Sequence, residues 1–76
     1  MGPYKVQQNI DGGGWNSATS RTYPDGADLD TVKAQLISEL EAQGMTKSAE
    51  DGYEWTMQFK AQSVQYRLVH NDDTPA

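Results

Sequence analysis

His70 is the only histidine of the 76-residue chain, and it is the first residue to consider for catalysis. An imidazole titrates near neutral pH and acts as a general acid or base when a carboxylate orients it. Asp72 and Asp73 follow closely, but all three lie where the last predicted strand gives way to a polar C-terminal segment. The chain has no cysteine and no Gly-x-Ser-x-Gly nucleophile motif. We therefore predict no catalytic residue and a protein that is not an enzyme.

The aspartate-rich stretch 25–30 is the candidate for cation binding. A calcium loop of the EF-hand type needs glycine at its sixth position and glutamate at its twelfth. Counted from Asp25, the glycine comes second and the twelfth residue is Leu36. A Pro-Asp-Gly turn followed by a helix N-cap at Asp28 explains the same residues. The sequence predicts neither a metal site nor a cofactor.

The three consecutive glycines 12–14 raise the question of phosphate binding. Phosphate loops lead directly into a helix and usually supply a lysine. Here the triplet leads into Trp15 and has no lysine beside it. A hairpin connection is the better interpretation. Trp15 lies outside any strongly periodic element, so it either anchors a partner or covers one end of a small core.

Two runs of alternating apolar residues, 53–59 and 64–68, predict a C-terminal β-hairpin. Placing Phe59 opposite Val64 puts every large apolar side chain of both runs on one face and leaves a four-residue connection, 60–63. That face is the predicted core of the protein.

The spacing of four apolar residues predicts a helix whose buried stripe covers this face; they are Leu29, Val32, Leu36 and Leu40. Gly44 is the expected residue after the helix C-cap. A Schellman ending there would place Met45 against Leu40.

Two further strands are predicted before the helix, a clear one over 4–10 and a weaker one over 18–23. The segment 46–52 leads back into the sheet, with a short edge strand as an alternative. We predict an α+β fold of two layers, with one helix packed on a four-stranded, mainly antiparallel sheet in the order β-β-α-β-β. Residues 1–70 would form a single domain, and 71–76 a flexible C-terminal tail.

The charge balance indicates the kind of partner. Six basic residues against eleven acidic ones give a formal net charge of −5. A negative field disfavours direct binding to nucleic acid or an anionic membrane and favours basic partners. The absence of cysteine favours the cytoplasm, and no apolar run has the length of a signal peptide or a membrane span.

We expect a small acidic, non-enzymatic protein-binding module, that is, an inhibitor, adaptor or regulatory subunit that acts on a basic surface of a larger protein. An inhibitor of a nucleic-acid-binding enzyme, from a phage or mobile element, is a narrower form of this expectation. The residues expected to make the contact are Trp15, Tyr23, Asp25, Glu39 and Glu41.

Two alternatives stay open. The small residues Ala34, Ser38 and Ala42 recur every four positions on the helix, so this helix face is a candidate homodimer surface. Single-stranded nucleic acid could instead bind through aromatic residues on the sheet, namely Tyr53, Trp55, Phe59 and Tyr66.

Overall fold

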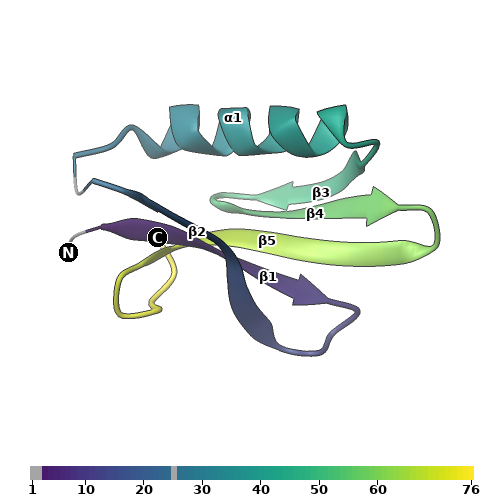
Figure 1. The fold of residues 1–76 in the computed structure, drawn as a ribbon, viewed down its shortest axis with the longest axis horizontal. Helices are drawn as coiled ribbons and strands as arrows, with labels where there is room; N and C mark the ends of the chain where they lie inside the picture. Colours follow the sequence, from purple (N-terminus) through teal and green to yellow (C-terminus); the bar gives the residue numbers. More distant parts are fainter. Residues whose placement is uncertain (1–2, 25) are drawn as a thin grey trace.

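In the computed structural model, five strands form one antiparallel sheet and a single helix lies on one of its faces (Figure 1). The structure describes residues 3–24 and 26–76, apart from the side chains of 19–21. The strands follow the spatial order β2-β1-β5-β4-β3. The elements are β1 (Tyr4–Ile10), β2 (Trp15–Tyr23), α1 (Leu29–Ala42), β3 (Thr46–Asp51), β4 (Glu54–Phe59) and β5 (Gln62–His70).

The α+β class is confirmed, but the prediction of a four-stranded sheet is wrong. The additional strand is β3, which pairs with β4 at the edge of the sheet. All six of its residues are exposed, so its sequence carries no alternation of buried and exposed side chains that would reveal a strand. A single bridge between Val69 and Pro75 adds one more short pairing beside β5.

The C-terminal hairpin has the predicted faces in a different register. Trp55 lies opposite Tyr66, and Met57 lies opposite Val64. The pairing is thus displaced by two residues from the predicted one, and the connection shortens to Lys60 and Ala61, with Lys60 at a φ of 57°. Because side chains alternate with a period of two, this displacement leaves every apolar residue on its predicted face.

Both ends of α1 form as predicted. The side chain of Asp28 accepts a hydrogen bond from the backbone N of Asp30 at 3.1 Å, which satisfies one of the unpaired donors of the first turn. At the other end Gly44 adopts a φ of 95°, and the N–H of Met45 donates to the carbonyl of Leu40 at 3.2 Å. This is the Schellman arrangement. No helix in the described part of the chain combines the length and the apolarity needed to cross a bilayer.

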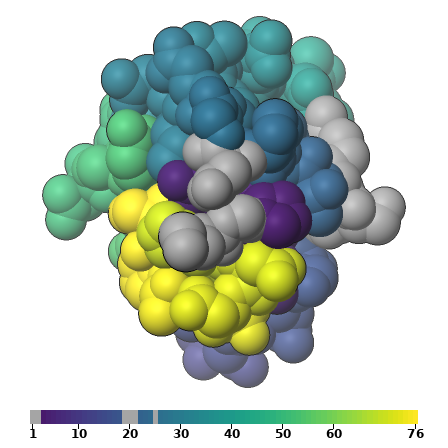
Figure 2. Space-filling view, turned by 90° about the vertical axis from the view of Figure 1, so that its left-hand side faces the viewer, coloured from purple at the N-terminus to yellow at the C-terminus, as the bar shows by residue number. Residues whose placement is uncertain are grey.

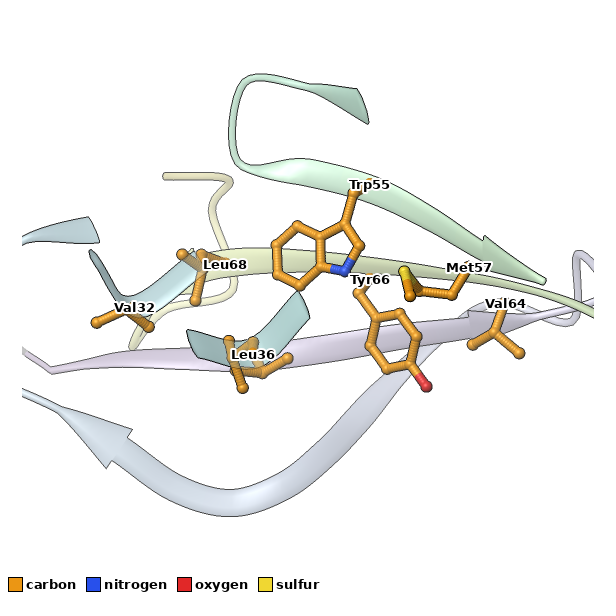
Figure 3. Close-up of a cluster of buried hydrophobic side chains, with 8 residues drawn as sticks. Val32, Leu36, Trp55, Met57, Val64, Tyr66 and Leu68 are labelled. Atoms are coloured by element: carbon orange, nitrogen blue, oxygen red, sulfur yellow. The ribbon is translucent and has the colours of Figure 1, made fainter. Parts of the chain in front are cut away.

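The core lies between α1 and the sheet. Figure 3 shows Val32 and Leu36 of the helix with Trp55, Met57, Val64, Tyr66 and Leu68 of the central strands, all of them buried. Phe59, which is expected on this core face, is 36% exposed. It is the last residue of β4 and lies beside Gly44, just beyond the end of the helix, so the helix does not cover it fully.

The helix covers the core face of the sheet unevenly. In Figure 1, α1 runs above β3 and β4, whereas β1 and β2 bend down and away from it. Lys33 reaches from α1 to Glu50 on β3, which ties the helix to that side. The first hairpin is thus the part of the sheet that the helix covers least.

The C-terminal segment 71–76 turns back beside β5. The N–H of Asp73 donates to the carbonyl of His70 at 2.9 Å, and that of Ala76 donates to the carbonyl of Leu68 at 3.0 Å. In Figure 2 this segment, in yellow, lies on the side of the sheet opposite the helix. The mobility of this segment stays a prediction.

Candidate binding site

A cleft of about 340 Å³ opens between the second half of α1 and the first hairpin. This volume is at the lower end of the range for ligand-binding pockets. The lining combines apolar side chains with two amides, a carboxylate and a phenol, and it consists of Val6, Gln8, Ala18, Leu36, Glu39, Leu40, Gln43, Trp55 and Tyr66.

An irregularity in the first hairpin accounts for the position of the cleft. Lys5 pairs with Thr22, but Gln7 pairs with Ser17, so four residues of β2 lie opposite Val6 alone. Extra residues in one strand bend it and increase its local twist. The hairpin therefore turns away from the helix at the level of Ala18, which lines the cleft.

Two stacked rings contribute to the lining on the sheet side. The ring centroids of Trp55 and Tyr66 are 6.0 Å apart and their planes are inclined by 17°. Burial raises the pKa of the Tyr66 phenol, so its neutral form is favoured. The indole Nε1 of Trp55 is buried and has no acceptor among the described residues. An unsatisfied buried donor of this kind costs about 1–3 kcal/mol.

The helix wall follows helical spacing. Leu36, Glu39, Leu40 and Gln43 fall at i, i+3, i+4 and i+7, so they share one side of α1. Leu36 is buried, whereas Glu39 and Gln43 are exposed. The cleft therefore has apolar side chains toward the core and polar side chains, Glu39 and Gln43 among them, toward its rim.

Two exposed apolar side chains lie on the same face of the sheet as the cleft. Ile10 is 42% exposed and pairs with Val64, and Phe59 is 36% exposed and follows Met57 by two residues. They are the large hydrophobic residues that the described part of the chain exposes. A Cβ at Gly44 would be 3.6 Å from the Phe59 ring, so this ring lies beside the end of the helix.

Of the five residues expected to contact a partner, the four that the structure describes do not form one surface. Trp15 pairs with Asn9 and faces away from the helix. Tyr23 is half-buried against the core, and Glu39 lines the cleft. Glu41 is exposed on α1, about 200° around the helix from Glu39 at 100° per residue. The last one, Asp25, lies outside the described residues.

Trp15 instead belongs to a polar cluster on the face of the sheet opposite the helix, called the open face below. The guanidinium carbon of Arg67 lies 4.1 Å from the Trp15 ring centroid, and its Nε donates to the Gln7 side chain at 2.9 Å. Gln7 is 7% exposed and donates in turn to Asp73, which also pairs with Lys5 at 2.7 Å. These contacts hold the C-terminal segment against the open face.

A second charged cluster fastens the helix to β3. Glu50 forms ion pairs with both Lys33 and Lys47. Hydrogen bonds from the two ammonium groups lower the pKa of the Glu50 carboxyl to about 2. Since Lys5 also has a carboxylate partner, three of the chain's basic side chains are neutralised within the molecule.

His70, the residue first considered for catalysis, does not line the cleft. The His70 ring is 5.0 Å from the Tyr4 ring at the end of β5. Within residues 3–24 and 26–76, no group of three or more acidic, histidine or cysteine side chains could hold a metal ion. Two of the aromatic residues considered for base stacking, Trp55 and Tyr66, are buried beneath the helix.

Searches against protein-family models, curated proteins and solved structures returned no match. The functional argument therefore rests on the geometry of this chain. Of the residues that line the cleft, Glu39 is a contact residue predicted from the sequence, whereas Gln8, Ala18 and Gln43 are not. Nothing in their local pattern distinguishes them, because the cleft arises from the bend in β2.

Proposed function

We propose that the protein is a non-enzymatic protein-binding module and that the cleft between α1 and the first hairpin receives its partner. The partner is a protein that presents a large apolar side chain next to a lysine or arginine. The apolar side chain enters the cleft, and the basic group approaches Glu39. The observation that carries this proposal is a cleft whose lining combines apolar side chains with a carboxylate.

The apolar part of the proposal is supported by where the exposed hydrophobic residues lie. Ile10 and Phe59 are on the cleft face of the sheet, and neither belongs to the buried core. Buried anchors surrounded by apolar contacts supply most of the energy of protein interfaces. A partner that filled the cleft and covered these two side chains would remove the largest exposed apolar groups from water.

The charge of the molecule supports a basic partner. The net charge is −5, and Lys5, Lys33 and Lys47 are already paired within the molecule. A surface with excess carboxylates raises the association rate of a positively charged protein and discriminates against acidic ones. A nucleic-acid-binding enzyme, which carries such a basic surface, is the narrower form of the proposal.

The test is affinity capture from the native host's lysate with two charge-matched variants, Glu39→Lys and Glu54→Lys. Both change the net charge equally at exposed positions, but Glu54 lies opposite Arg67 on the open face of the sheet. A third variant, Ala18→Phe, adds a ring inside the cleft. Circular dichroism checks that each variant is folded before capture.

We expect one protein to be retained by the wild type and by Glu54→Lys. The captured amount of this protein should fall at least about tenfold with Glu39→Lys and with Ala18→Phe, as for the loss of a central interface contact. Equal retention by all folded variants would refute a role for the cleft. Loss with Glu54→Lys alone would move the binding site to the open face.

A further inference from the structure

We infer that the part of the partner that fills the cleft is an amphipathic α-helix, which lies beside α1 on the core face of the sheet. This inference rests on the proposed function and specifies the form in which the partner's apolar side chains enter the cleft. It is supported by the width of the sheet, by the pairing of the strands beneath the cleft and by an exposed apolar side chain next to it.

The sheet is wider than the single helix that covers it. Five strands spaced about 4.8 Å apart place the outer two about 19 Å from each other, whereas a helix with its side chains is about 10 Å across. The helix α1 contacts β3, and Lys33 pairs with Glu50 there. The core face above β1 is therefore covered only in part, and the cleft lies where a second helix would run beside α1 (Figure 1).

The strands beneath the cleft offer side chains rather than backbone groups. Val6 and Gln8 belong to β1, and Tyr66 belongs to β5; β1 pairs with β2 and β5, and β5 pairs with β1 and β4. A segment that enters the cleft must therefore satisfy its own backbone donors and acceptors, since burying them unpaired costs free energy. A helix satisfies them internally, whereas a single extended segment needs a neighbouring strand.

The spacing of the contacts fits one turn of a helix. On β1, Gln8 lines the cleft, and Ile10 follows on the same face about 6.8 Å further along the strand, where it is 42% exposed. Residues i and i+4 of a helix are about 6 Å apart along its axis and share one face. An apolar residue at i would thus enter the cleft against Leu40 and Tyr66, while another at i+4 would cover Ile10.

The outer side of the added helix would remain in water beside an acidic chain. The net charge is −5, and Lys5, Lys33 and Lys47 are already paired within the molecule. Basic residues on this outer side are therefore favoured by the field of the whole chain rather than by one carboxylate. The occupant is a helix with apolar residues at i, i+4 and i+7 and with lysine or arginine on its opposite face.

The experiment uses a blocked peptide of four helical turns with leucine at i, i+4 and i+7, lysine and glutamine elsewhere, and a lactam bridge on its polar face that keeps it helical. One control has the same composition and bridge but leucines spread around the helix. A second control keeps the leucine positions but has a central proline and no bridge. Dissociation constants are measured by NMR with the full chain labelled with nitrogen-15, as wild type, Ile10→Asn and Gln65→Ala.

We expect the bridged peptide to bind the wild type at least about tenfold more tightly than either control, because only its leucines reach the cleft and Ile10 together. The variant Ile10→Asn should weaken this binding at least about fivefold, as for an energetically important interface residue. Gln65 lies opposite Asn9 on the open face, so Gln65→Ala should leave the binding unchanged. Circular dichroism checks that both variants are folded.

Equal binding of the two bridged peptides would mean attraction by charge alone and would refute the helical occupant. Tighter binding of the proline peptide would refute it in favour of an extended segment. Absence of binding at millimolar bridged peptide, or binding that Ile10→Asn leaves unchanged, would overturn it as well. The lysate capture decides the proposed function independently, since a partner lost with Ala18→Phe occupies the cleft whatever its secondary structure.

Discussion

Trp55 of β4 and Tyr66 of β5 lie directly opposite each other, with ring centroids 6.0 Å apart on the face that α1 covers. The same two rings belong to the buried core and to the lining of the cleft. Packing that stabilises the fold therefore also shapes the proposed binding site. A change in either ring should alter both stability and recognition.

The first prediction separates the two tryptophans. Trp55 is 1% exposed, whereas Trp15 is half-buried on the open face. Trp55→Ala should lower the free energy of unfolding by about 3–5 kcal/mol, as for other large-to-small core changes. Trp15→Ala should lower it by about 1 kcal/mol or less, since it removes mainly a ring–guanidinium contact. Urea denaturation followed by circular dichroism measures both; equal losses would contradict the assignment of Trp55 to the core.

The second prediction concerns acid stability. The pKa of Glu50 falls to about 2 in the folded chain because Lys33 and Lys47 stabilise its charged form. A carboxyl with a lowered folded pKa adds stability above its unfolded pKa and loses it as the pH falls toward the folded value. The wild type should thus lose stability between pH 4.5 and about pH 2, that is, between the ordinary pKa of this carboxyl and its pKa in the folded chain.

Glu50→Gln should remove part of that pH dependence, because glutamine does not titrate. Thermal unfolding across the same pH window measures the slope for both proteins. Glu54→Gln is the matched control, since Glu54 is an exposed carboxylate without an ion pair among the described residues. Identical slopes for wild type and Glu50→Gln would contradict the assignment of the ion pairs.

The third prediction concerns the end of α1. Gly44 has a φ of 95°, a conformation that L-residues avoid, and a Cβ there would make only ordinary contact with Phe59 at 3.6 Å. Gly44→Ala should therefore lower stability by about 1–2 kcal/mol through backbone strain alone. Gly26→Ala is the control, because its φ lies outside the strained range and nothing lies within 4 Å. The two variants are compared by urea denaturation, and a Gly44→Ala protein as stable as Gly26→Ala would argue against the Schellman ending.

The fourth prediction tests the contacts of the C-terminal segment. Asp73 accepts from Gln7 at 3.1 Å and pairs with Lys5 at 2.7 Å. Asp73→Ala should accelerate hydrogen exchange at Ala76, whose N–H donates to the carbonyl of Leu68, because the segment loses its side-chain attachment. Exchange at Ala76 that is already fast in the wild type would support the predicted mobility of 71–76 and show that Asp73 does not restrain it.

Local chemistry predicted several elements of this fold correctly. The N-cap at Asp28 and the left-handed Gly44 depend on short-range rules, and both appear where the sequence placed them. The prediction of which residues of β4 and β5 share the core face was also correct, because a register change of two residues keeps each side chain on its face. Burial of Trp55 followed from those faces.

The remaining features depend on interactions that a local pattern does not encode. The strand β3 is exposed along its whole length, so only its pairing with β4 defines it. The hairpin register is displaced because the turn contains only Lys60 and Ala61. The spacing of the apolar residues fits a two-residue turn and a four-residue connection equally well. The cleft depends on the extra residues of β2 opposite Val6, and so its lining could not be predicted.

Site-specific photo-crosslinking tests the central claim most directly. A benzophenone side chain replaces either Gln43, an exposed residue of the cleft, or Glu54, an exposed residue of the open face. After irradiation in host lysate, we predict that the partner identified by capture is crosslinked from position 43 and not from position 54. Crosslinking of that partner from position 54 alone would contradict binding at the cleft.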